Sequence, residues 1–196
     1  MKSGFIGVIG KANAGKSTLV NVLVGEKVSI VSPKPQTTRD AVMGVLTKPE
    51  YQLVFMDTPG IYKAQNRLSD MMQKTAQTAA KDVDFLLFVH DGHGGISADD
   101  IQLMQKYLSG KIPMAIAYTK IDIMPKERIL DDVKTLYENG ITCDVLPVSA
   151  RKFTNVSKLE AYLADKMPEG EKVISDDIVT DRSDRFMVSE VMREKI

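Results

Sequence analysis

The chain has 196 residues, 43% of them hydrophobic, with 26 basic and 26 acidic side chains. This length and apolar content suffice for one domain with a substantial core and an extension. A net charge of zero supplies no positive field for phosphate backbones, which argues against an autonomous nucleic-acid binder. No apolar stretch is long enough to span a bilayer, and the first residues do not have the pattern of a signal peptide. A single cysteine, Cys143, excludes an internal disulfide, so we expect a buried thiol in a reducing, cytoplasmic compartment.

A glycine-rich loop follows the first predicted strand, Phe5–Ile9, and precedes a predicted helix, Thr18–Val24. This context is typical of a phosphate-binding loop, because the glycines allow backbone N–H groups to turn toward a polyphosphate. Lys16 is placed to reach the β- and γ-phosphates, and the Ser17 hydroxyl to bind Mg²⁺, while the helix N-terminus favours the same anion. The alternative, a chance glycine-rich turn, does not explain the flanking strand and helix. The candidate phosphate ligands here are Gly10, Asn13, Ala14, Gly15, Lys16, Ser17 and Thr18.

Two strands predicted over 41–47 and 51–56 are close enough in sequence to form an antiparallel hairpin at the sheet edge. A proline-punctuated loop before them carries Thr38, a candidate metal ligand, although Ser/Thr pairs in loops more often form turns. The sequence Asp-Thr-Pro-Gly after them begins at Asp57, which we expect to hold the metal through water. Its Gly60 N–H is placed to contact a γ-phosphate.

The near-continuous apolar strands predicted over Phe85–His90 and Met114–Thr119 are typical of the centre of a parallel sheet. Thr119, Lys120 and Asp122 lie at the carboxyl end of the second, where open α/β sheets bind ligands. An aspartate there can accept hydrogen bonds from N1–H and the exocyclic amine of guanine, a donor pair that adenine lacks. These three residues therefore form a candidate guanine site. Alone, the Lys-x-Asp pattern is usually a solvated turn.

Ser149 and Ala150 follow the last predicted strand, Cys143–Val148, and are candidates to direct backbone N–H groups at guanine O6. Strands alternate with helices along the chain, which predicts an α/β fold with a mostly parallel six-stranded sheet, one antiparallel edge strand and helices on both faces. Residues at helical spacing predict core-facing stripes on two of the helices, formed by Ile101, Met104 and Leu108 and by Ile129, Val133 and Leu136.

In their order, these motifs resemble the five-motif P-loop GTPases, and among them the Era-type GTPases of ribosome assembly. The Era-type resemblance depends on the segment Lys34–Arg39 and on the tail Asp177–Phe186, so it spans essentially the whole chain. There are two departures. Thr119 stands where the family usually has Asn, which puts support of the phosphate loop in doubt. The family also ordinarily continues into an RNA-binding KH domain, whereas this chain stops at Ile196. No KH signature remains, because Gly92–Gly95 fits Gly-x-x-Gly only formally and lacks basic flanks.

The resemblance implies a GTP-binding domain over residues 1–168, followed over 169–196 by a linker and the first helix toward an absent KH domain. The chain ends inside that helix, so we expect a fragment. The implied function is a slow GTP-hydrolysing switch in small-subunit assembly and ribosomal RNA processing. The implied partners are GTP or GDP, small-subunit ribosomal RNA and the 30S subunit through the KH domain, with a monomeric state. The resemblance also suggests peripheral membrane association, although no polybasic amphipathic helix supports it.

Catalysis would depend on charge neutralisation by Lys16 and Mg²⁺, with Thr38 or its neighbour Thr37 at the metal. Ile61 stands where many GTPases have a water-orienting Gln, so we expect slow turnover. Two roles for Asn13 stay open. In related GTPases an asparagine here holds K⁺ against the phosphates; otherwise Asn13 only stabilises the loop.

Three functional alternatives also stay open. The first is a nucleotide-dependent interaction module in which hydrolysis is incidental, and the second is another GTPase of the same group. The third, a P-loop kinase or ATPase, would need adenine preference and an acceptor site. Arg39, in the loop that carries Thr38, would be an electrostatic contributor or a partner contact. His90 and His93 have no metal-ligand or triad companions at a recognisable spacing and are expected to be structural or solvated.

Overall fold

Strands and helices alternate along the chain in the computed structural model, which describes all residues except 32–40, 60–82, 184, 187, 190–191 and 193–196. The described elements are, in chain order, β1 Lys2–Ile9, α1 Lys16–Val24, β2 Val42–Thr47, β3 Tyr51–Asp57, β4 Phe85–Asp91, the 3-10 turn η1 Gly92–Gly94, α3 Ala98–Leu108, β5 Met114–Thr119, the 3-10 turn η2 Ile121–Ile123, α4 Lys126–Glu138, β6 Val145–Pro147 and α5 Val156–Lys166.

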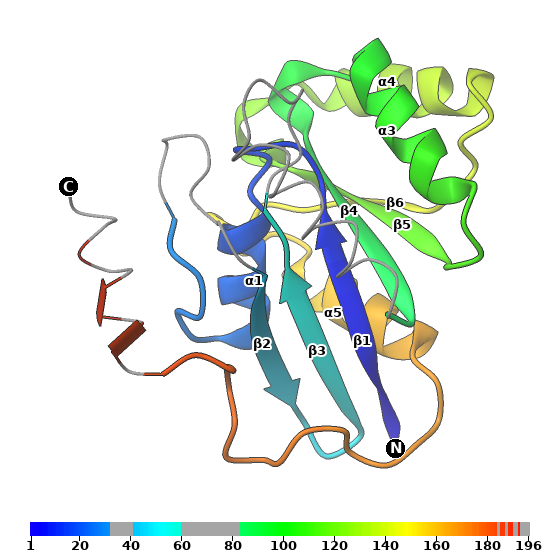
Figure 1. Cartoon of the computed structure of the whole chain (residues 1–196). Coiled ribbons are helices and arrows are strands. Elements are labelled where there is room, and N and C mark those ends of the chain that lie inside the picture. The colour runs from blue at the N-terminus through cyan, green and yellow to red at the C-terminus, as the bar shows by residue number, and fades with distance from the viewer. Residues whose placement is uncertain (32–40, 60–82, 184, 187, 190–191, 193–196) are drawn as a thin grey trace, which may run out of the picture.

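The strands form one six-stranded sheet in the order β2-β3-β1-β4-β5-β6 (Figure 1). β2 pairs antiparallel with β3, while the other described pairs are parallel. This confirms the predicted fold class, including the antiparallel edge strand. β1 begins at Lys2 rather than Phe5, because Lys2 and Ser3 continue the register with Tyr51 and Gln52 although they carry no apolar signal.

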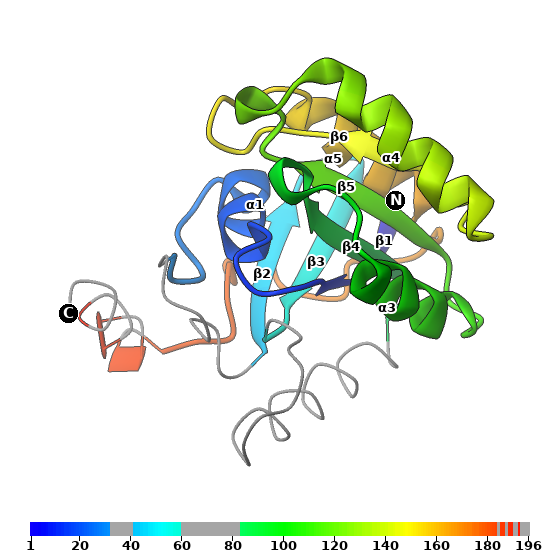
Figure 2. The ribbon, with the colours of Figure 1, turned by 90° about the horizontal axis from the view of Figure 1, so that it is seen from above.

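Helices cover both faces of the sheet, as predicted (Figures 1 and 2). On one face, Leu19 of α1 and Leu159 of α5 belong to a buried cluster with side chains of β1, β3 and β4. On the other, Met104 of α3 and Leu136 of α4 belong to a second cluster with side chains of β4 and β5. Parallel strands buried on both sides explain the near-continuous apolar runs of the sequence.

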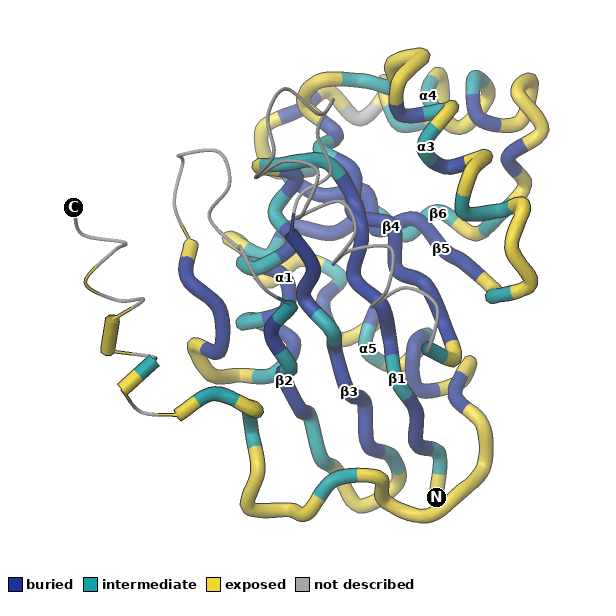
Figure 3. The backbone as a smooth tube through the Cα atoms, viewed as in Figure 1, coloured by how far each residue is buried: buried dark blue, intermediate teal, exposed yellow. Residues whose placement is uncertain are grey.

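The predicted core stripe of α4 is wrong at Val133, whose exposure is 38%. Leu136 is buried in the same helix, whereas Leu130 and Tyr137 are exposed. α4 lies beside the edge strand β6 (Figures 1 and 2), which is only three residues long, so the sheet offers the helix a narrow surface and much of α4 is exposed (Figure 3).

β6 is shorter than the predicted strand Cys143–Val148, since its ladder with β5 covers only Val145 to Pro147. Cys143 lies just before it and is half-buried, and burial raises the pKa of its thiol to about 11. The thiol therefore stays protonated and unreactive near neutral pH.

The segment after α5 runs along the sheet edge instead of leaving the domain (Figure 1). The Val45 N–H donates to the Val179 carbonyl at 2.8 Å, and Gly44 pairs with Thr180 in an antiparallel bridge. This segment, residues 169–182, thus lies against the open edge of β2 at Val179 to Asp181, while its earlier residues contact the starts of β1 and β3. The described residues between 185 and 192 are helical. None of the described helices is both long and apolar enough to cross a bilayer.

Candidate nucleotide-binding site

The glycine-rich loop joins β1 to α1 through left-handed backbone conformations. Gly10 has φ +143°, and a Cβ at this position would lie 2.2 Å from the Val89 carbonyl oxygen of β4, so only glycine fits. Gly15 has φ +94° at the N-cap of α1, and Asn13 adopts φ +59° between them. The loop therefore curls at the carboxyl end of the central strand, with the N-terminus of α1 at its base.

Lys16 is buried inside this loop. Its Nζ donates to the carbonyl oxygens of Lys11 at 2.9 Å and Gly10 at 3.2 Å. Burial lowers the pKa of Lys16 to about 8, although the charge of Asp57 acts in the opposite direction. An ammonium held in a poorly hydrated loop interacts strongly with an anion that enters it.

Ser17 in α1 and Asp57 at the end of β3 form a hydrogen-bonded pair of side chains. The Ser17 hydroxyl donates to Asp57 Oδ2 at 2.7 Å, and Asp57 is fully buried. Both side chains offer hard oxygen atoms, the donors that Mg²⁺ prefers. Within the described ranges, no three His, Cys, Asp or Glu side chains gather into a metal cage. Mg²⁺ usually takes one or two protein ligands and fills its shell with water and phosphate oxygens, so the oxygen atoms of Ser17 and Asp57 suit it.

Thr119 supports the phosphate loop from the end of β5. Its hydroxyl lies 2.7 Å from the Ala14 carbonyl and 2.9 Å from the His90 carbonyl, both buried contacts. The substitution of Thr for the family's usual Asn therefore keeps a contact with the loop. A hydroxyl has only one proton, however, so it donates to one of these two acceptors at a time.

Lys120 ties the same motif to the phosphate loop by a second route. Its Nζ donates to the Asn13 carbonyl at 2.9 Å and forms an ion pair of 2.6 Å with Asp91 at the end of β4. Asp91 was not among the predicted site residues, although its place directly after an apolar predicted strand is a signal that the sequence contains.

Asp122 and Ser149 meet across neighbouring strand ends. The buried Ser149 hydroxyl donates to Asp122 Oδ1 at 2.6 Å, and this hydrogen bond lowers the pKa of the exposed Asp122 carboxyl. The backbone N–H of Lys152 in turn donates to Ser149 Oγ at 3.1 Å. Asp122 is therefore ionised and oriented at neutral pH, with Ala150 half-buried next to Ser149.

The remaining predicted residues fall in three groups. Thr18 is half-buried in the first turn of α1. His90 is buried, with its Nδ1 3.8 Å from the Asp100 carboxylate, a companion that sequence spacing did not reveal, while His93 is exposed in η1. The others lie outside the described residues: Thr37, Thr38, Arg39, Gly60 and Ile61.

Comparisons with known proteins agree with this arrangement. The family described as 50S ribosome-binding GTPases matches residues 5–120. GTPase Era of Clostridium novyi is 44% identical over 194 residues, which cover 99% of this chain and 66% of that protein. A structure of Era with MgGDPNP and nucleotides 1506–1542 of 16S ribosomal RNA superposes with a TM-score of 0.93 at 35% identity. The superposition covers all of this chain and 67% of the chain in that structure. A structure of an Aquifex aeolicus Era variant bound to GDP·AlF₄⁻ gives the same values. The chain spans about two thirds of the length of these relatives.

Proposed function

The chain belongs to the Era family of GTPases, and we propose that it binds GTP with Mg²⁺ and hydrolyses it slowly, as a molecular switch. One observation carries this proposal: the Lys16 loop, the Ser17–Asp57 pair and the Asp122–Ser149 pair come together at the carboxyl edge of one sheet. That edge is where open α/β sheets bind nucleotides.

On the phosphate side, the ammonium of Lys16 and the N–H groups of Gly10 and of Asn13 to Thr18 bind the polyphosphate. Ser17 would hold Mg²⁺ through its hydroxyl and Asp57 through water, and the 2.7 Å contact between their side chains brings the two oxygen atoms together. When bound, the metal neutralises charge that develops on the phosphoryl oxygens. Thr38 as a further metal ligand and Gly60 as a γ-phosphate contact complete the proposed set.

On the base side, the Asp122 carboxylate accepts hydrogen bonds from N1–H and the exocyclic amine of guanine. The Ser149 hydroxyl donates to this carboxylate and keeps it in place. Ala150 presents its backbone N–H to O6, while Thr119 and Lys120 connect the base site to the phosphate loop. Lys16 stabilises the transition state of hydrolysis. Asn13 either holds K⁺ there or only shapes the loop, and activation by K⁺ would decide between the two.

In the cell, we propose that this switch acts in small-subunit assembly and ribosomal RNA processing. A relative's complex with 16S ribosomal RNA supports such a partner. Residues 1–168 form the GTP-binding domain, and 169–196 connect it toward an RNA-binding KH domain. The monomeric state, the cytoplasmic location and the peripheral membrane association remain predictions from the sequence.

Competition for fluorescent GDP tests the proposal. In Mg²⁺ buffer GTP should displace the probe and ATP should not, and GTP hydrolysis should be slow and faster in KCl than in NaCl if Asn13 binds K⁺. Equal competition by ATP would contradict the base assignment and with it the proposed function.

Asp122→Asn gives a sharper test of the base site. The amide donates where the carboxylate accepted, so the variant should lose GTP and gain xanthosine triphosphate, which carries a carbonyl in place of the guanine amine. We expect a loss of about 10²-fold or more in GDP affinity, because a site built to hydrogen-bond leaves polar groups unpaired with the wrong base. Exposed Asp131→Asn on α4 is the matched control and should change neither preference.

A further inference from the structure

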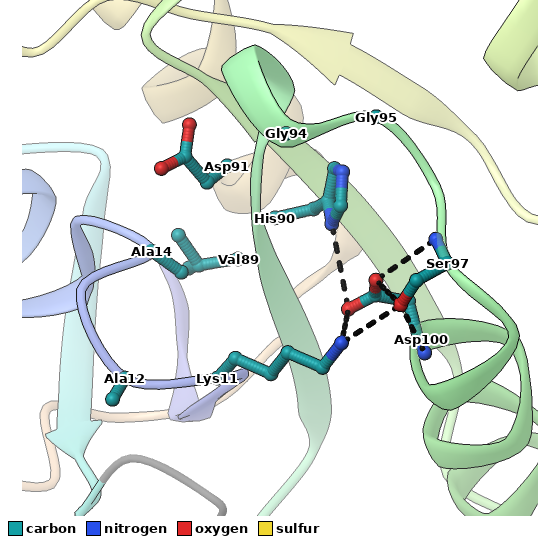
Figure 4. Close-up of a pocket in the computed structure, with 10 residues that line it drawn as sticks. All are labelled: Lys11, Ala12, Ala14, Val89, His90, Asp91, Gly94, Gly95, Ser97 and Asp100. Carbon is teal, nitrogen blue, oxygen red and sulfur yellow. Dashed lines mark hydrogen bonds and ion pairs between the residues drawn. The ribbon is translucent and has the colours of Figure 1, made fainter.

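An ion pair outside the proposed nucleotide contacts joins the phosphate loop to α3. Lys11 extends from the outer side of the loop, and its Nζ lies 2.9 Å from Asp100 Oδ1 and 2.9 Å from Ser97 Oγ (Figure 4). The pair borders a cavity of about 270 Å³ between the loop, the end of β4 and the start of α3. Lys11 is 86 residues from Ser97 in sequence, so this contact depends on the fold alone.

Asp100 is held rigidly at its end of the pair. Its carboxylate accepts from the Ser97 N–H at 3.0 Å and from the Ser97 hydroxyl, and Ser97 and Asp100 form the capping box that begins α3. Its side chain is only 5% exposed. Burial raises the pKa of Asp100, but contacts with His90, Ser97 and Lys11 outweigh burial and hold it well below its usual range. The carboxylate is therefore charged and fixed when Lys11 meets it.

At the other end of the pair, the backbone carbonyl of Lys11 contacts the side chain of Lys16. The carbonyl of Lys11 accepts from Lys16 Nζ at 2.9 Å, so the Lys11 side chain is anchored to α3 while its backbone holds the ammonium of Lys16. A shift of the Lys11 backbone would displace this ammonium and the loop N–H groups that follow. Errors of about 1 Å in a binding constellation are costly.

We propose that Lys11 and Asp100 are positioning residues for nucleotide binding. Their ion pair fixes the first turn of the phosphate loop to the start of α3 and so keeps Lys16 in place for the phosphates. The inference rests on the proposed function, since it concerns the same nucleotide.

Four variants test this pair by GDP dissociation constant and by thermal unfolding midpoint: Lys11→Ala, Asp100→Asn, the double variant of both, and Lys11→Arg. Lys11→Ala and Asp100→Asn should each raise the GDP dissociation constant roughly ten-fold, which is the effect expected from the loss of one charge-assisted hydrogen bond. The double variant should be no weaker than the weaker single variant, because both changes break the same contact. Lys11→Arg keeps the charge and should stay within about two-fold of the wild type. Lys2→Ala removes an ion pair of 2.8 Å with Asp165 far from the loop, and should leave GDP affinity unchanged.

The outcomes separate this inference from the proposed function. If the unaltered protein binds no GDP, both are overturned. If it binds GDP and Lys11→Ala changes only the unfolding midpoint, or if the losses add in the double variant, the positioning role alone is wrong. Should Asp100→Asn fail to fold, Lys11→Ala and Lys11→Arg still decide, because the Lys11 side chain is 38% exposed and its loss creates no cavity in the core.

Discussion

Lys16 combines burial with a charge that burial makes easier to lose, because its pKa is lowered from the ordinary value for lysine. Its pKa of about 8 reflects burial beside the backbone carbonyls of Gly10 and Lys11. A bound polyphosphate favours the ammonium and raises that pKa. Nucleotide binding is therefore linked to proton uptake by this one side chain above neutral pH.

GDP affinity should fall as the pH rises above about 8, by at most about ten-fold per pH unit, because free Lys16 deprotonates while bound Lys16 stays charged. Titration calorimetry in buffers of different ionisation enthalpy should detect proton uptake at about pH 8.5 and much less at about pH 7. Lys16→Arg remains charged throughout, so it should bind more weakly but lose this proton uptake. Equal uptake in the arginine variant would assign the proton to another group.

Thr119 contributes one proton to two buried carbonyl acceptors, those of Ala14 and His90. Thr119→Val keeps the shape and removes the proton, which leaves both carbonyls without this donor. We expect a loss of about 1–3 kcal/mol in the free energy of unfolding and weaker GDP binding, because Ala14 belongs to the phosphate loop. Thr119→Asn offers two N–H donors and should bind GDP at least as tightly as the wild type.

Thr135→Val is the control for this prediction. Thr135 also donates to a carbonyl, that of Asp131 at 3.0 Å, but within α4. Its loss should leave GDP affinity unchanged. If Thr119→Val binds GDP as the wild type does, the hydroxyl does not support the loop.

At the scale of elements, Gln52 joins the segment 169–182 to the sheet. Gln52 is fully buried in β3, and its Oε1 accepts from the N–H groups of Val173 and Ile174 at 3.0 Å each. Its Nε2 donates to the Ile174 carbonyl at 2.8 Å and to Thr47 Oγ1 at 2.9 Å. One amide thus satisfies the backbone of a segment more than a hundred residues away.

Gln52→Leu should detach this segment while the nucleotide site stays intact. Three backbone groups lose their buried partner, so we expect about 2–4 kcal/mol less stability and faster hydrogen exchange over residues 173–181. GDP affinity should not change, since Gln52 lies at the start of β3 and Asp57 at its end. Gln105→Leu, at an exposed glutamine of α3, is the control for the substitution itself. Unchanged exchange in the Gln52 variant would show that β2 alone holds the segment.

Local patterns predicted most of the fold and the central motifs. Apolar strands, four of the six followed by a motif at the carboxyl end, were enough to predict the sheet and to bring Lys16, Asp57 and Asp122 to one edge. The pairs Lys11–Asp100 and Lys120–Asp91 were not predicted, because side chains so far apart in sequence meet only through the register of β1, β4 and β5. Val133 was misplaced because periodicity shows which residues share a face and not how much sheet lies beneath it.

At the scale of the whole molecule, the balance of charges decides which partners residues 1–196 can bind by themselves. The chain carries 26 basic and 26 acidic residues, so it lacks the field that counterion release from RNA requires. Residues 1–196 alone should therefore have little affinity for RNA, whatever the nucleotide state of the GTP site.

Fluorescence anisotropy with the RNA segment 1506–1542 of 16S ribosomal RNA tests this directly. We expect only non-specific affinity, with a Kd of about 10⁻⁴ to 10⁻⁶ M at physiological salt that is equal for a scrambled RNA of the same length. GDP and a non-hydrolysable GTP analogue should give the same result, because neither adds a basic surface. Sequence-specific binding below this range in the GTP-analogue state would instead place an RNA contact on this part of the protein, built from local geometry rather than from net charge.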